Sequence, residues 1–182
     1  MHTWTIDPSH TNIEFAVRHM GLSTVRGRFA AFSGSVTTDQ RGAPTSVSVD
    51  IETASIDTNA RDRDAHLRSP DFFDAGAHPT IAFRSTAVRT AGDERYEVTG
   101  ELTMHGVTRP VTLEAEVGAP VRDPWGQWRR AAVVSGKLNR KEFGLAWNQV
   151  LEAGALLVGE EVRLSFDVQV TTQEEIVAPA PV

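Results

Sequence analysis

The sequence predicts an all-β protein of about eight antiparallel strands with one short helical segment, at about residues 59–74. Two observations support this fold class. Apolar and polar residues alternate with a period of two through most of the 182-residue chain, and turn-forming residues separate these runs at intervals typical of a β-sandwich or β-barrel. The alternation stops in one charged stretch, residues 59–79, which reads NARDRDAHLRSPDFFDAGAHP.

The strands follow from the alternating runs, because strict alternation indicates half-buried antiparallel strands with one dry face. In residues 11–20, Ile13, Phe15, Val17 and His19 share one face, and the residues between them share the other. The remaining clear runs are residues 45–56, 80–88, 95–104, 111–117 and 161–170. Such a sheet can stack as a sandwich or close into a barrel, and the alternation does not choose between them. A barrel of about eight strands can hold one apolar ligand.

The charged stretch is expected to form a short helix. Asn59 is a good N-cap, and Asp62 three residues later completes a pattern like a capping box. Asp64 and Arg68 are four residues apart, in the order that favours a surface ion pair. Pro70 is expected to end this helix and, with Ser69 before it, to begin a second short turn.

The side chains of this stretch leave several interpretations open. The turn after Pro70 carries Phe72 and Phe73, which need a dry environment, so the segment can act as a lid on the sheet. Arg61, Arg63 and Arg68 could hold a phosphate bidentately, but ion pairs with the neighbouring aspartates on a solvated helix are favoured for any one of them.

Length and composition limit the protein class. The chain suits one domain, residues 1–172, followed by a flexible tail, residues 173–182, with a polyproline-like end. The absence of cysteine excludes disulfides and thiol catalysis, and the net charge of −6 argues against a nucleic-acid partner. The first residues do not resemble a signal peptide, and the apolar runs are far shorter than a membrane span. We therefore expect a cytoplasmic protein without stable membrane insertion.

No sequence motif favours catalysis or metal binding. The six histidines lack the close spacing of a metal site, and no nucleophile elbow or phosphate loop is present. Asp7, Ser9 and His10 lie together, but a turn is the favoured interpretation because catalytic triads are assembled in space. We therefore expect that the protein is not an enzyme and that it has no catalytic residue and no metal. The alternative is a lipid esterase or isomerase with His10, His19 or His66 as the general base.

Four blocks carry a resemblance to a known family: WTIDPSHTNIEFAVRHMGLSTVRGRF, IDTNARDRDAHLRSPDFFDAGAHPTIAFRST, VTGELTMHGVTRPVTL and LNRKEFGL. In this order, from about Trp4 to Val170, they resemble the YceI-like bacterial lipid-binding proteins. The block with Arg61-Asp62, His66-Leu67, Asp71-Phe72-Phe73 and Pro79 is the most specific. The resemblance implies an extended lipocalin-like antiparallel barrel around a long apolar tunnel. It also implies a bound amphiphile, such as a polyisoprenoid lipid, its phosphate, an isoprenoid quinone or a fatty amide.

The resemblance gives expectations for individual residues. The helical segment would cover one side or mouth of the barrel, and His19, Arg61 and His66 are the candidates for contact with the head group. The expected function is non-catalytic binding, transport or storage of the lipid, without a catalytic cofactor. The alternative is stress-related sequestration of hydrophobic molecules such as antibiotics. Exposed barrel strands are compatible with a homodimer. The residues expected to line the tunnel are Ile13, Phe15, Val17, Phe29, Phe72, Phe73, Phe83, Phe143, Leu164 and Phe166.

Overall fold

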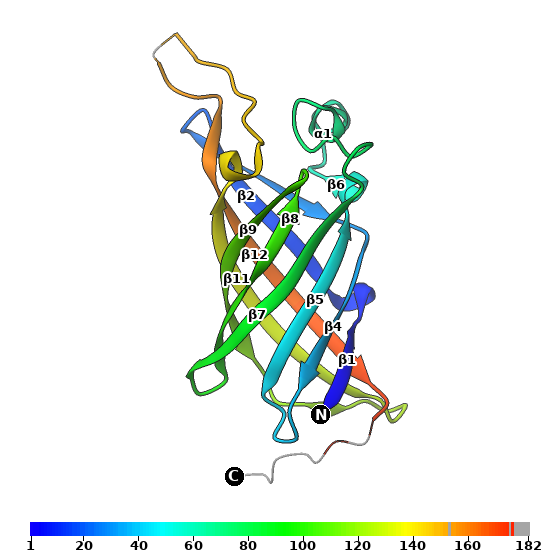
Figure 1. Cartoon of the computed structure of the whole chain (residues 1–182). Coiled ribbons are helices and arrows are strands. Elements are labelled where there is room, and N and C mark those ends of the chain that lie inside the picture. Colours follow the sequence, from blue (N-terminus) through cyan, green and yellow to red (C-terminus); the bar gives the residue numbers. More distant parts are fainter. Residues whose placement is uncertain (153, 175, 177–182) are drawn as a thin grey trace.

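The structure is a computed structural model that describes residues 1–152, 154–174 and 176 (Figure 1). The expected tail therefore falls mainly on residues 175 and 177–182, which lie outside the described part. The α-helix and strands are β1 (His2–Ile6), β2 (Asn12–His19), β3 (Ser23–Phe29), β4 (Phe32–Thr38), β5 (Pro44–Glu52), β6 (Ile56–Asp57), α1 (Arg61–Arg68), β7 (Thr80–Gly92), β8 (Arg95–Met104), β9 (Val107–Val117), β10 (Val121–Arg122), β11 (Trp128–Asn139) and β12 (Val158–Thr172). Single 3-10 turns occupy Pro8–His10, Thr53–Ser55 and Arg140–Phe143.

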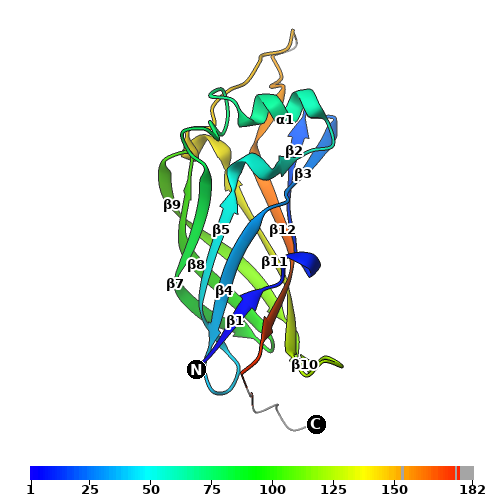
Figure 2. The same cartoon turned by 90° about the vertical axis from the view of Figure 1, so that its right-hand side faces the viewer.

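The sheet closes on itself as a barrel (Figures 1 and 2). In the described part of the chain, eight strands pair in the order β11-β9-β8-β7-β5-β4-β1-β12, and every pair is antiparallel. The ring is completed by β11 and β12, which pair from Trp128↔Thr172 to Asn139↔Glu161. Closure confirms the predicted all-β barrel and decides against the sandwich.

Strand β12 is long enough to pair with two strands in succession along one side. Its C-terminal end pairs with β1, as in Ile6↔Val170, and its N-terminal two thirds pair with β2, as in Val17↔Val162. Its 15 residues span about 50 Å at about 3.4 Å per residue. The β2–β3 hairpin thus extends the wall at the end that carries α1, which we call the helix end. The opposite end, with His2 and the β4–β5 turn at residues 39–43, is the terminus end (Figure 1).

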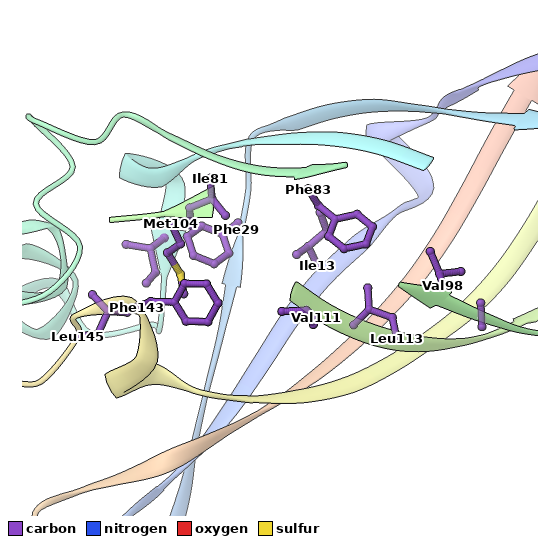
Figure 3. Packing of buried hydrophobic residues seen from close by; sticks show 12 residues of the cluster. Ile13, Phe29, Ile81, Phe83, Val98, Met104, Val111, Leu113, Phe143 and Leu145 are labelled. Carbon is purple, nitrogen blue, oxygen red and sulfur yellow. The ribbon is translucent and has the colours of Figure 1, made fainter. Parts of the chain in front are cut away.

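The dry faces of the strands point into the barrel, as the alternation predicted. On β9, Val111, Leu113 and Ala115 are buried, whereas the residues between them are exposed. A larger apolar cluster runs along the inside of the barrel, with one group next to the helix and another farther along the strands (Figure 3). The barrel interior is therefore the hydrophobic core of the protein.

The charged stretch forms the expected short helix, but it begins differently. Helix α1 ends at Arg68, with Ser69 as its C-cap, before Pro70 as predicted. Its N-cap is Ala60, whose side chain makes no cap hydrogen bond, so the prediction of Asn59 as the N-cap is wrong. Asn59 instead has φ 60° in the turn that precedes the cap, a conformation that asparagine tolerates better than most residues.

Asp64 and Arg68 of α1 bond to the preceding chain instead of to each other. The buried Asp64 carboxylate accepts hydrogen bonds from the Thr58 backbone N–H (2.8 Å) and hydroxyl (2.6 Å). The Arg68 guanidinium donates to the carbonyls of Ala54 and Ile56, both at 2.7 Å. The predicted Asp64–Arg68 ion pair is therefore wrong, because both side chains fasten the helix to the segment before it.

A buried arginine organises the connection between β11 and β12 at the helix end. Arg140 is 3% exposed, and its guanidinium donates to the carbonyls of Gly159 (2.8 Å), Trp147 (2.9 Å) and Val158 (3.3 Å), as well as Leu145. Burial lowers the pKa of Arg140. One side chain thus supplies hydrogen bonds to both ends of the segment that connects the two strands.

Candidate ligand-binding cavity

An apolar cavity of about 170 Å³ lies inside the barrel. All eight barrel strands contribute to its wall, and β2 adds Ile13. On β12 the wall residues are every second one, from Leu164 to Val170, because alternate side chains of a strand point to the same face. The wall extends for about 20 Å along this strand at about 3.4 Å per residue. This shape suits an elongated apolar group.

Four of the residues expected to line a tunnel lie on this wall: Ile13, Phe83, Leu164 and Phe166. Phe83 is 8% exposed and packs over Gly100 on the neighbouring strand β8. A Cβ atom on Gly100 would lie only 2.5 Å from Phe83 Cζ, so the glycine makes room for the ring. Contact between these four residues and a ligand stays a prediction.

The other six residues lie outside the cavity wall, at the helix end. The Phe29 ring packs between those of Phe15 (5.7 Å between centroids) and Phe73 (5.9 Å). Phe143 is 1% exposed in the same cluster, close to Met104 (Figure 3). These rings fill the space between the barrel and the segment after α1, so they close the helix end. The remaining two residues are Val17, half-buried on β2, and Phe72, packed against Trp147.

The three expected head-group residues also lie at the helix end and away from the cavity wall. His19 is the last residue of β2, opposite Ser23 of β3, and Arg61 is exposed on the first turn of α1. The His66 ring is 2.9 Å from the Asp71 carboxylate and meets Trp147 edge-on. None of these three side chains contributes to the cavity wall in the part of the chain that the structure describes.

The polar groups of the cavity lie instead at the terminus end, where sequence reasoning did not place any. The buried Trp4 indole N–H donates to the Thr38 hydroxyl at 3.1 Å. Arg130 is the single charged residue on the wall within the described chain. Its guanidinium donates to the carbonyl of Gly118 (2.7 Å) and to that of Gly42. The sequence contained a sign of its inward position. Arg130 is four residues from Val134, and residues separated by an even number on a strand point to the same face.

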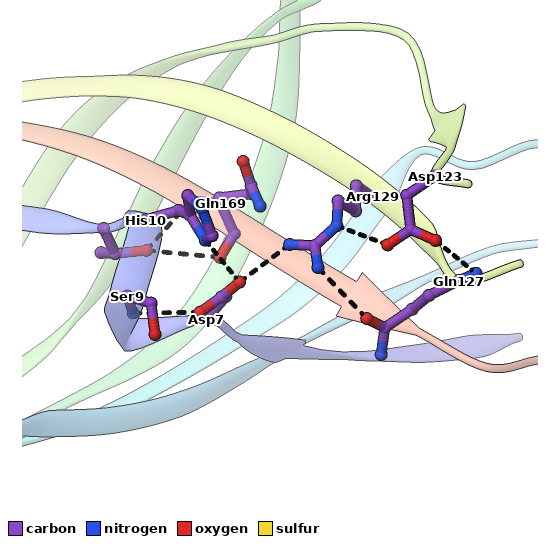
Figure 4. Close-up of polar contacts among 8 residues, drawn as sticks. Asp7, Ser9, His10, Asp123, Gln127, Arg129 and Gln169 are labelled. Atoms are coloured by element: carbon purple, nitrogen blue, oxygen red, sulfur yellow. Dashed lines mark hydrogen bonds and ion pairs between the residues drawn. The ribbon is translucent and has the colours of Figure 1, made fainter. Parts of the chain in front are cut away.

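The local cluster of Asp7, Ser9 and His10 forms a turn, the favoured interpretation. Asp7 caps the first 3-10 turn by accepting a hydrogen bond from the Ser9 backbone N–H (3.0 Å), and its other oxygen lies 2.9 Å from His10 Nδ1 (Figure 4). Arg129 joins Asp7 to Asp123, with both N–O distances 2.8 Å. The bond to His10, followed by that to Arg129, lowers the pKa of Asp7 to about 2. The network fastens β1 to β11.

Acidification is expected to remove the stabilisation that Asp7 contributes. Its pKa falls from an ordinary 3.8 to about 2 on folding, so the contribution is complete above 3.8 and is lost as the pH falls through about 2. The maximum effect is about 2 kcal/mol. Urea unfolding of Asp7→Asn between about pH 2.5 and pH 6 should show lower stability at the upper limit and a weaker pH dependence than wild type. Asp93→Asn, in the exposed β7–β8 turn, is the control. An unchanged pH dependence in Asp7→Asn would contradict the assignment.

No three His, Asp or Glu side chains of residues 1–152, 154–174 and 176 gather closely enough to hold a metal ion. No helix in this part of the chain has the length and apolar character needed to cross a bilayer.

Comparison with known proteins agrees with the fold. Solved structures with the same fold include BcnA of Burkholderia cenocepacia, with a TM-score of 0.78 and 23% identity over 90% of this chain and 98% of that one. They also include the Campylobacter jejuni YceI protein, with a TM-score of 0.74 and 26% identity over 86% and 90%. A polyisoprenoid binding domain from Saccharophagus degradans has a TM-score of 0.67 and 16% identity over 97% and 98%.

Sequence comparison identifies the family. A UPF0312 protein of Vibrio parahaemolyticus is 42% identical over 138 residues, which are 75% of this chain and 73% of the relative. A UPF0312 protein of Photorhabdus laumondii is 45% identical over 139 residues, covering 76% and 72%. The family model for the YceI-like domain matches residues 4–170, nearly the whole barrel. The chain therefore belongs to the YceI-like family.

Proposed function

We propose that this protein binds the apolar tail of a single lipid inside its barrel and carries or stores that lipid without changing it chemically. The observation that carries the proposal is the apolar cavity enclosed by all eight barrel strands. Burying a methylene group contributes about 0.8 kcal/mol, so a tail of about 20 carbons gains about 15 kcal/mol before entropy and desolvation costs. Transfer from water to such a wall therefore provides affinity without any reacting group.

An isoprenoid is the lipid class that we propose. The structural neighbour from Saccharophagus degradans is described as a polyisoprenoid binding domain, and it has the same fold as this chain. The branched and aromatic side chains of the wall, among them Val98, Leu113 and Phe166, suit a methyl-branched tail as well as a straight one. The ligand class supported by the wall is thus an elongated hydrocarbon, with isoprenoids first.

Native mass spectrometry of freshly purified protein, followed by organic extraction, tests this proposal. We expect an adduct that is released by solvent and identified as a prenyl lipid. For protein without an adduct, titration with geranylgeraniol should displace an apolar fluorescent probe from the barrel. Protein without an adduct that also binds neither the probe nor geranylgeraniol would overturn the proposal.

A matched pair of variants locates the binding in the barrel. Ala115 lies on the cavity wall, so Ala115→Phe should fill part of the cavity and reduce lipid content and probe binding at least about fivefold. Val133 is 59% exposed on the outer face of β11, so Val133→Phe should leave both unchanged. Equal binding by the two folded variants would place the lipid outside the cavity.

A further inference from the structure

The inner face of β11 changes from apolar to cationic at the terminus end. Val134 and Ala132 line the cavity. Arg130 lies on the same face, two residues before Ala132 and nearer the terminus end. The Arg130 guanidinium reaches two carbonyls on different connections: that of Gly118, which follows β9, and that of Gly42 in the β4–β5 turn. A positive charge thus lies across one end of an apolar cavity.

Among the described residues, this charge has no counter-ion in direct contact. The two carbonyls accept hydrogen bonds but carry no net charge, and within the described residues Arg130 forms no ion pair. Burial lowers the pKa of Arg130, and the nearby Tyr96 and Glu94 oppose this shift only in part. Nη2 makes no hydrogen bond to described residues, so part of the guanidinium fork is unused. A partly buried cation in this state gains strongly from an oxyanion.

A second donor, without a partner among the described residues, lies on the same face of β11 as this charge. Trp128 precedes Arg130 by two positions on β11, so both side chains point to the same face and their Cα atoms are about 7 Å apart. The Trp128 indole N–H is buried and has no hydrogen-bond partner in the described part of the chain. A buried indole N–H normally donates to an acceptor, so among the described residues the Trp128 N–H is a donor that a ligand oxygen near Arg130 could satisfy.

We propose that the terminus end of the cavity is a head-group site in which Arg130, with the Trp128 N–H, binds the oxyanion of an acidic amphiphile, a phosphate or a carboxylate. The inference rests on the proposed function and extends it. The tail would run from Arg130 along the wall towards Ile13 and Phe83, and the aromatic rings of the helix end would limit its depth. The head group would lie at the end of the barrel opposite α1.

Two lipids with the same tail and different head groups test the site. Wild-type protein, delipidated and refolded, is titrated with geranylgeranyl monophosphate and with geranylgeraniol. We expect the phosphate to bind at least about tenfold more tightly, since a bidentate contact with arginine is charge-assisted. In Arg130→Met, which keeps an unbranched apolar stem, this preference should disappear while the affinity for the alcohol stays within about threefold. Arg89→Met, at an exposed position of β7, should behave as wild type.

Further arms separate the possible sources of the oxyanion. The affinities for palmitate and hexadecanol show whether a carboxylate head group is preferred over a hydroxyl in the same way. Titration with inorganic phosphate alone shows whether the site binds a free anion. Trp128→Phe keeps an aromatic ring without the N–H, and it should weaken phosphate binding about threefold to tenfold with no effect on the alcohol. This variant keeps the test decisive if Arg130→Met does not fold.

The outcomes are distinguishable. If the alcohol and the phosphate bind wild type equally, or if Arg130→Met and Trp128→Phe keep the preference, the head-group site is overturned while the lipid-binding function stands. If inorganic phosphate binds alone and the tailed phosphate gains nothing over it, the site is an anion site and not a lipid site. If neither lipid binds to wild type, the proposed function fails and the head-group site fails with it.

Discussion

Phe83→Asp is expected to empty the barrel or to unfold it. The Phe83 side chain is 8% exposed on the cavity wall and packs over Gly100. The substitution removes a large buried ring and puts a carboxylate on an apolar surface, so the free energy of unfolding should fall by about 4 kcal/mol or more. Urea unfolding measures the loss, and organic extraction of the purified protein measures the remaining lipid.

Two control variants separate the effect of a charge on the cavity wall from the effects of losing the ring or of adding a carboxylate elsewhere. Phe83→Leu keeps the wall apolar and should retain lipid, with a smaller loss of stability. Arg89→Asp puts the same carboxylate on the same strand at an exposed position, and it should change neither quantity appreciably. Unchanged stability and lipid content in Phe83→Asp would show that Phe83 does not belong to the binding wall.

Arg140→Met is expected to destabilise the protein by about 3 kcal/mol or more, because four carbonyl groups lose a buried charged donor. The loss should be uneven. Backbone amides of the described residues between 145 and 158 should exchange hydrogen much faster than before, while those of β9 and β11 should keep their relative protection. Hydrogen exchange read by mass spectrometry, together with urea unfolding, separates the local effect from the global one.

The neighbouring residue provides the control for Arg140. Lys141 lies in the same 3-10 turn and forms an exposed ion pair with Glu160 at 2.9 Å, so Lys141→Met should cost less than about 1 kcal/mol. Equal losses in the two variants would mean that the Arg140 hydrogen bonds contribute no more than a surface pair. Faster exchange throughout the barrel in Arg140→Met would likewise contradict a local role.

The fold was predictable where each strand has one dry face. The alternation from Val162 to Val170 predicted β12, and the run from Val111 to Val117 predicted β9. Strand β11 carries less of this signal, because its inner face combines small residues with Arg130 and Trp128. The helix cap was missed for a different reason. The Asp64 carboxylate bonds back to the chain before the helix, and a capping pattern contains no information on that contact.

The site was predictable only in part, because alternation tells which face a side chain occupies and not its height in the barrel. Phe83 and Phe29 both point inwards, yet one lines the cavity and the other packs against the rings near α1. Height depends on strand register and tilt, which come from pairing between distant segments. Arg130 was missed because arginine is normally placed on the solvent side of a strand, and only its position in the pairing pattern shows otherwise.

The double pairing of β12 also affects how the barrel can form. This last strand in chain order borders β11, β1 and β2, so three strands keep an unsatisfied edge until it is in place. Contacts between the first and last strands have the longest sequence separation in the chain, and such contacts form slowly. Before β12 is added, the sheet exposes both its apolar face and strand edges that invite aggregation. A ribosome-bound chain that lacks β12 therefore cannot close its barrel. We expect chaperones to bind the exposed apolar face of this incomplete sheet until β12 has been synthesised.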